Sequence, residues 1–92
     1  MSRLLAFEAD RAETEGTWTR VDSSNLYAVY YQPDFQRLFV WFGGNERQPR
    51  LTRYVYESVD PATYAGLLAA PSKGQFLDQK LKKGGYAYSG PF

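Results

Sequence analysis

Three arginines and two tyrosines stand close together in the middle of the chain. Arg47, Arg50 and Arg53 fall within seven residues, and Tyr54 and Tyr56 follow directly. Guanidinium groups bind phosphate oxygens, and tyrosine rings offer flat faces on which nucleobases stack. Together with Lys73 on a later segment, these residues form a candidate surface for RNA or another single-stranded nucleic acid.

Each of these residues also has an ordinary structural explanation. Glu46 neutralises part of the charge near the arginines, and charged residues on a surface need no special cause. Aromatic residues favour strands, so Tyr54 and Tyr56 also fit a role in core packing. The sequence leaves both interpretations open.

Phe39 and Trp41 form a second candidate surface. Side chains alternate along a strand, so these two rings face away from the apolar residues beside them in sequence. One interpretation buries them under residues 1–16, where Leu4, Leu5 and Phe7 are clustered. The other leaves them as an exposed patch for another protein or for a second copy of the chain.

The residue types that are missing exclude several kinds of chemistry. The chain has no Cys and no His, so it has no thiolate nucleophile, no imidazole base and no His/Cys zinc site. The acids at positions 8, 10, 13 and 15 lack the spacing of a calcium loop. A chain of 92 residues with a shallow sheet also offers little room for a water-excluding cleft. We therefore expect a binding domain that is not an enzyme and that takes no metal or cofactor.

The length fits one domain, and the charge points to no strongly polyanionic partner. Eleven basic residues against ten acidic ones give a net charge of +1 over 92 residues. No apolar run approaches the length of a membrane span, and the first apolar residues meet Glu8 too early for a signal peptide. We expect a cytoplasmic domain with no membrane partner.

The segments that must position these residues begin with strands. β-branched and aromatic residues predict strands at 17–22, 26–32, 37–42 and 51–57. Pro33 and Asp34 lie between the second and third of these, which predicts a hairpin there. A short extended segment at 86–88 is a candidate last strand. Residues 1–16 fit a short helix, an edge strand or partial disorder.

After the strand expected at 51–57, apolar residues no longer recur at every second position but at the period of a helix. Asp60 followed by Pro61 is typical of a helix start, and Ser72 with Gln75 has the spacing of a capping box. These signals predict helices at 61–70 and 73–83, the second ending at Gly84-Gly85.

The predicted fold class is α+β: a small antiparallel sheet of three to four strands, followed by two short helices packed on one face. Residues 1–16 are a lead-in, and residues 17–92 are a single domain. The expected core consists of Leu26, Val29, Leu38, Val40, Phe42, Leu67, Leu68, Phe76, Leu77 and Leu81.

The order of elements and several short motifs resemble the KTSC domain, a small module named for its occurrence at the C-terminus of some lysyl-tRNA synthetases. The motifs run in the family's order: Val21-Asp22-Ser23-Ser24, Tyr31, Leu38-Phe39-Val40-Trp41-Phe42, Tyr54-Val55-Tyr56, Thr63-Tyr64-Ala65-Gly66-Leu67-Leu68 and Ala70-Pro71-Ser72-Lys73-Gly74-Gln75-Phe76. The resemblance covers about residues 20–88. It implies the fold above and, through the synthetase fusion, a role in RNA binding.

Overall fold

The computed structural model describes residues 3–23 and 25–92; Met1, Ser2 and Ser24, which belong to the expected lead-in and to one KTSC-like motif, lie outside this part. Its elements in chain order are α1 (Arg3–Glu15), β1 (Thr19–Arg20), β2 (Leu26–Gln32), β3 (Arg37–Phe42), β4 (Thr52–Tyr56), α2 (Pro61–Ala69), α3 (Lys73–Phe76), η1 (Leu77–Lys82) and β5 (Tyr88–Ser89). The described strands form one five-stranded antiparallel sheet in the order β1-β2-β3-β4-β5. The predicted α+β class with an antiparallel sheet is confirmed.

The three long strands form the centre of the sheet and the two outer strands are short. β2 and β3 are joined by the predicted hairpin, in which Gln32 pairs with Arg37. β1 and β5 contribute only two residues each to the sheet. Most of the segment 17–22, which was expected to be a strand, is therefore irregular. Five strands therefore replace the three or four expected, because the short segments at both ends of the domain also pair with the sheet.

The helices after the sheet begin where the sequence predicts. The Asp60 carboxylate accepts a hydrogen bond from the Thr63 amide at 2.7 Å, and the Ser72 hydroxyl accepts one from the Gln75 amide at 3.4 Å. The second helix is not a regular α-helix along its whole length, since η1 is a π-helix in which the Lys83 amide donates to the Asp78 carbonyl oxygen at 2.8 Å. Gly84 follows, where a Cβ atom would lie 2.0 Å from the Lys80 carbonyl oxygen.

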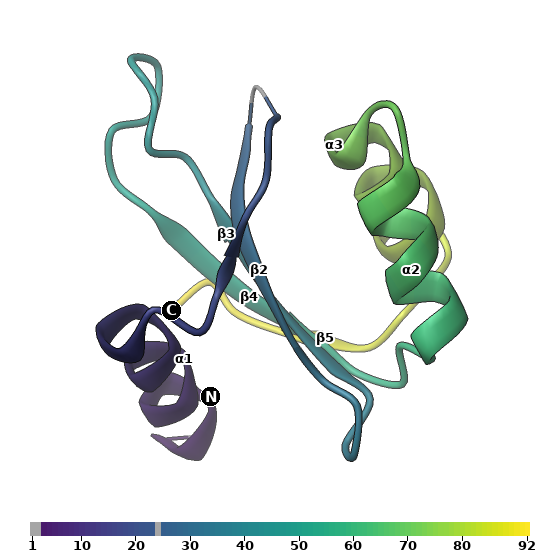
Figure 1. Ribbon diagram of the computed structural model, residues 1–92, viewed down its shortest axis with the longest axis horizontal. Helices are drawn as coiled ribbons and strands as arrows, with labels where there is room; N and C mark the ends of the chain where they lie inside the picture. Colours follow the sequence, from purple (N-terminus) through teal and green to yellow (C-terminus); the bar gives the residue numbers. More distant parts are fainter. Residues whose placement is uncertain (1–2, 24) are drawn as a thin grey trace.

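α2, α3 and η1 cover one face of the sheet (Figure 1). The buried core on this face contains Leu26, Val29, Leu38, Val40, Tyr56, Val59, Leu67, Leu77 and Leu81, with Phe42 and Phe76 partly buried against it. Nine of the ten expected core residues thus lie in or against this core. Leu68 does not, because it lies on the outer side of α2 and is 38% exposed.

Residues 3–15 form a helix, α1, on the opposite face of the sheet (Figure 1). Its buried residues Leu5, Ala9 and Ala12 pack in a second core with Ala28, Phe39, Trp41 and Val55. Of the alternatives for the lead-in, residues 3–15 thus adopt the helix and not the edge strand. The sheet is covered on both faces: the two predicted helices lie on one, and α1 covers the other, as in the interpretation that buried Phe39 and Trp41 under residues 1–16.

In the described part of the chain, none of the helices combines the length and the apolar character needed to cross a membrane. Residues 3–23 and 25–92 likewise contain no group of three or more acidic side chains placed to hold a metal ion.

Candidate functional site

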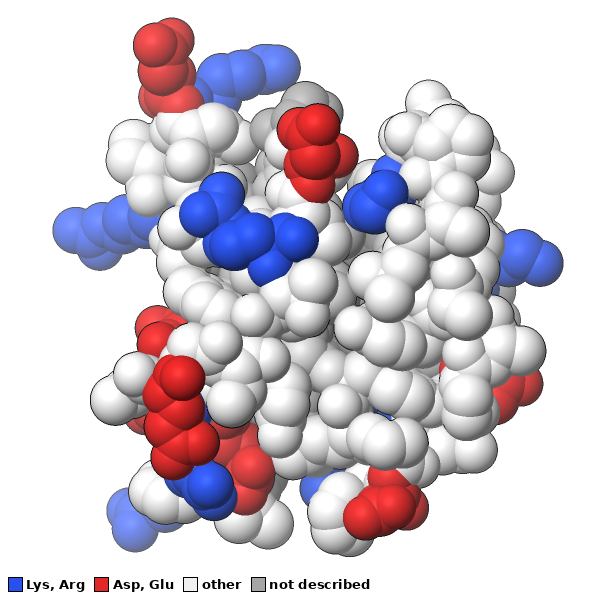
Figure 2. Space-filling view, viewed as in Figure 1, with Lys and Arg blue, Asp and Glu red and all other residues white. Residues whose placement is uncertain are grey.

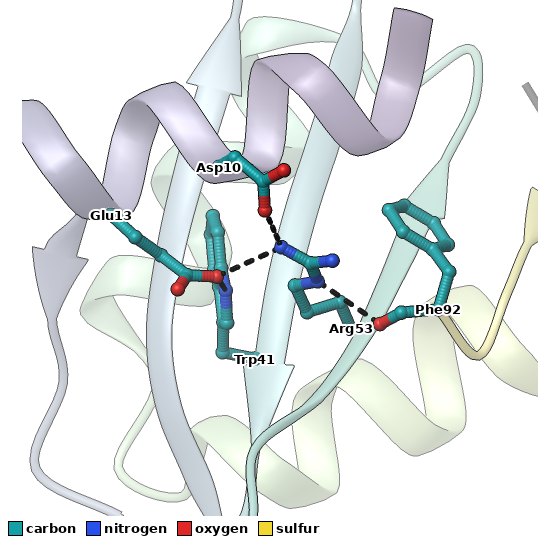
Figure 3. A network of polar contacts seen from close by, with 5 residues as sticks. All are labelled: Asp10, Glu13, Trp41, Arg53 and Phe92. Carbon is teal, nitrogen blue, oxygen red and sulfur yellow. Dashed lines mark hydrogen bonds and ion pairs between the residues drawn. The ribbon is translucent and has the colours of Figure 1, made fainter. Parts of the chain in front are cut away.

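Arg53 lies in strand β4 and points to α1, so it is separated from the arginines of the preceding loop. Its guanidinium donates to the carboxylates of Asp10 at 2.5 Å and Glu13 at 3.1 Å, and to the carbonyl oxygen of Phe92 at 3.0 Å (Figure 3). The Arg53 side chain is 21% exposed. These three contacts hold the guanidinium within the protein, and the expectation that Arg53 binds phosphate together with Arg47 and Arg50 is not supported.

The charge of Arg53 is stabilised by these partners. Burial lowers the pKa of the Arg53 guanidinium, but hydrogen bonds with Asp10 and Glu13 and the attraction of their charges outweigh it, so the pKa is raised above its ordinary value. Arg53 is therefore a permanent cation that attaches α1 and the last residue, Phe92, to the sheet.

Phe39 and Trp41 lie beside Arg53 under the same helix. They are 1% and 0% exposed, and the indole nitrogen of Trp41 donates to the Glu13 carboxylate at 2.7 Å. Trp18 covers the edge of the Trp41 ring, with ring centroids 5.1 Å apart. The two rings are thus core residues, and the exposed patch on which the protein-interaction alternative depended does not form.

Tyr54 and Tyr56 face the other way, because side chains alternate along β4. There a groove of about 710 Å³ opens between the sheet and the segment α3–η1. It is lined by Ser23, Asn25, Phe42, Gln48, Thr52, Tyr54, Tyr56, Ser72, Gly74, Gln75, Leu77, Asp78, Lys82 and Tyr88. This groove is the candidate functional site.

Four aromatic rings form the floor of the groove. Tyr54 meets Phe42 edge to face, with centroids 5.8 Å apart, and Tyr88 lies 6.1 Å from Tyr54 and 5.8 Å from Tyr56. Tyr56 is nearly buried, whereas Tyr88 is 58% exposed. Tyr56 is thus mainly a packing residue, and Tyr54 and Tyr88 present ring surface to the groove.

The Tyr56 hydroxyl stays protonated at any physiological pH. Burial raises the pKa of Tyr56, and the charges of Tyr54, Tyr88 and Asp78 raise it further. Tyr56 can therefore act as a hydrogen-bond donor at the groove but not as a base.

The wall opposite the floor comes from α3 and η1. Leu77 and Leu81 of the π-helix enter the core, and Asp78 and Lys82, each one residue further along, line the groove. π-Helical turns are frequent at functional sites because they rotate side chains out of the regular α-helical positions. Amide side chains complete the rim, with Gln75 on this wall and Gln48 at the end formed by the loop 43–51.

Arg47 and Arg50 are exposed in the loop 43–51, the same loop that brings Gln48 to the groove. Within the described residues neither arginine forms an ion pair. Lys73 lies beside the lining residues Ser72 and Gly74, and its amine donates to the Ala70 carbonyl oxygen at 3.2 Å. These three cations thus belong to segments that border the groove.

The basic side chains do not form a continuous stripe on the face seen in Figure 2. They stand in small groups with uncharged surface and acidic side chains between them. Attraction to a polyanion therefore has to come from a few local cations rather than from the field of a whole face.

Several groove residues were not predicted from the sequence, among them Gln48, Gln75, Asp78, Lys82 and Tyr88. Tyr88 could be anticipated in part, since residues 86–88 were expected to be extended. Its pairing with Tyr56, however, requires the chain after η1 to run back to the edge of the sheet. Asp78 and Lys82 had no such signal, because the groove between this helix and the sheet forms only in the tertiary structure.

Comparison with known proteins gives a consistent result. The model of the KTSC domain matches residues 22–86. The chain belongs to the KTSC domain family. The crystal structure of a KTSC domain protein from Yersinia pestis is similar, with a TM-score of 0.63 and 28% identity, over 78% of this chain and 92% of that one. No curated protein matches the chain.

The family segment contains most of the groove and none of α1. Every lining residue except Tyr88 falls within residues 22–86, whereas Arg3–Glu15 lies before them. The KTSC domain thus supplies the groove, and α1 is added to its other face.

Proposed function

We propose that this KTSC domain is a non-catalytic module that binds single-stranded RNA in the groove between the sheet and α3–η1. The observation that carries the proposal is the aromatic floor, in which the ring of Tyr88 is largely exposed and stands 6.1 Å from Tyr54. Single-stranded nucleic acids bind through such rings, because every base has a flat face that can stack.

The rim supports the same ligand class. Gln48 and Gln75 can donate to and accept from the edges of unpaired bases. Lys82 lines the groove, and Arg47, Arg50 and Lys73 border it, so they are available for phosphates. The cytoplasm, where single-stranded RNA is abundant, is the proposed compartment.

Binding should be weak and sensitive to salt. Each phosphate contact on a single strand contributes a slope of about 0.7 to the plot of log affinity against log salt concentration. About three contacts, from Arg47, Arg50 and one lysine, therefore give a slope near −2. We expect dissociation constants no better than micromolar at physiological salt.

Fluorescence anisotropy of a labelled five-nucleotide RNA, measured at several salt concentrations, tests this proposal. Tyr88→Ala should weaken binding about tenfold, since stacking on one ring contributes about 1–3 kcal/mol. Phe35→Ala is the matched control, because Phe35 is also an exposed ring (62%) but lies in the β2–β3 turn. Equal effects of the two substitutions, or no binding at low salt, would contradict the proposal.

The salt slope gives an independent check. Arg47→Gln combined with Arg50→Gln should flatten it by about 1.4, which corresponds to two phosphate contacts. The control is Arg3→Gln combined with Arg11→Gln, which removes the same charge from α1 on the other face. A slope that the two double variants change equally would indicate attraction to net charge alone.

A further inference from the structure

Asp78 is the one carboxylate among the described residues that line the groove. Its side chain is 44% exposed, and its ion pair with Lys83 is long, at 3.4 Å, and involves a lysine side chain that is 72% exposed. Exposed pairs of this kind are weak, so the Asp78 carboxylate remains able to accept hydrogen bonds from a ligand. An acid is unexpected in a groove for a polyanion, and its presence calls for a partner that donates hydrogen bonds.

The position of Asp78 relative to the rings narrows what this partner is. Asp78 lines the same groove as Tyr56 and Tyr88, and it comes from the wall that η1 forms. Tyr88, the most exposed ring, lies 5.8 Å from Tyr56. A base stacked on Tyr88 therefore lies in the groove whose wall carries Asp78.

Lys82 presents a complementary group on the same wall. It lines the groove four residues after Asp78 on η1, so one donor and one acceptor group stand next to each other. The wall offers a cation for a carbonyl oxygen beside a carboxylate for N–H groups.

Guanine matches this pair better than the other bases. Its Watson–Crick edge carries the O6 acceptor followed by two adjacent donors, N1–H and the N2 amino group, and a carboxylate can accept from both donors at once. Uracil has a single N–H between two carbonyl oxygens, and adenine and cytosine each pair one amino donor with a ring acceptor that a carboxylate repels.

We infer that the groove selects guanine, with Asp78 accepting from N1–H and N2–H and Lys82 donating to O6. This inference rests on the proposed binding of single-stranded RNA and adds its base preference. Asp78 is the specificity-determining residue, because it distinguishes guanine from bases that stack equally well on Tyr88.

Competition of UUGUU, UUAUU, UUCUU and UUUUU for a labelled UUUUU strand, on the full chain, tests the inference. UUGUU should bind about tenfold more tightly than the other three, in the range given by a good bidentate contact to a base. UUIUU, in which inosine lacks the N2 amino group, should lose most of this advantage. A 7-deazaguanine strand should keep it, because N7 is not contacted.

Asp78→Asn provides the decisive variant. It should abolish the tenfold preference, so that UUGUU and UUUUU compete with equal affinity. Asp34→Asn removes an acid from the exposed β2–β3 turn and should leave the preference intact. Far-ultraviolet circular dichroism of both variants checks that the fold is retained.

The outcomes separate the two proposals. If no strand binds, the groove is not an RNA site and the guanine preference falls with it. If all strands bind equally, or Asp78→Asn keeps the preference for UUGUU, RNA binding stands and the role of Asp78 is refuted.

Discussion

The two faces of the sheet are both rich in aromatic residues, but they differ in how closely helices cover them. On one face α1 buries Phe39 and Trp41 completely. On the other, α3 and η1 leave a groove in which Tyr54 and Tyr88 keep exposed ring surface. Aromatic content alone therefore does not identify the binding face, because the same residue types serve burial on one side and access on the other.

The helix surfaces explain the difference. α1 turns Ala9 and Ala12 to the sheet, and such small side chains let a helix lie close over large rings. Its polar residues complete the closure, as Glu13 accepts from Trp41 and Arg53 and Glu8 accepts from Gln32 at 3.0 Å. On the opposite face, η1 directs a carboxylate and an ammonium group to the sheet-side groove, and charged groups there keep the space hydrated.

The largest expected effect is a difference in stability between a substitution on the closed face, which α1 covers, and one on the open face, which carries the groove. Phe39→Ala should lower the free energy of unfolding by about 3–5 kcal/mol, because it leaves a cavity under α1. Tyr88→Ala should lower it by less than about 1 kcal/mol, because that ring is already largely hydrated. Urea denaturation followed by circular dichroism measures both. Similar losses for the two variants would mean that the groove is part of the core.

A smaller effect is expected where arginines differ in their surroundings. Arg53→Met should cost about 1–3 kcal/mol, because it removes charged hydrogen bonds to Asp10 and Glu13 from a partly buried position. Arg50→Gln should leave stability nearly unchanged and weaken RNA binding instead. The free energy of unfolding and the RNA affinity are measured for both variants. A loss of binding in Arg53→Met at full stability would show that Arg53 contacts the ligand.

The smallest effect concerns alkaline pH. Burial raises the pKa of Tyr56 above 10.0, so the unfolded chain loses this proton before the folded protein does. The folded state favours the protonated Tyr56 hydroxyl. Its contribution to the free energy of unfolding is complete below pH 10.0 and is lost as the pH rises through the pKa of Tyr56 in the folded protein. The free energy of unfolding of the wild type should therefore fall relative to that of Tyr56→Phe from pH 8 to pH 11. A constant difference would show that Tyr56 ionises equally in both states.

Much of the fold was predictable because local signals determine it. β-Branched and aromatic residues marked the central strands, and the side chains of Asp60 and Ser72 cap the helices that they were expected to start. Leu68 was wrongly assigned to the core, because α2 turns Leu67 and, in part, Tyr64 to the core and leaves Leu68 on its exposed side. The position of α1 over Phe39 and Trp41 was one of two open interpretations, and the sequence did not decide between them because the contacts of α1 to the sheet span about 25 residues or more.

The candidate site was predictable only in part, for a similar reason. Tyr54 was identified, and the alternation that brings it to the groove also turns Arg53 away, a signal that the grouping with Arg47 and Arg50 overlooked. The remaining site residues come together through tertiary structure. Tyr88 reaches the groove through the pairing of β5 with β4, and Asp78 reaches it through the packing of η1 against the sheet.

The position of the two tryptophans has an optical consequence. The Trp18 and Trp41 rings stand 5.1 Å apart at 81°, on the face that α1 covers, and neither lines the groove. Their combined emission therefore reports whether α1 is docked: it lies at short wavelength while Trp41 is buried and moves to longer wavelength when the helix is released. A ligand in the groove leaves this emission unchanged, so one intrinsic signal monitors the closed face while labelled ligands probe the open one.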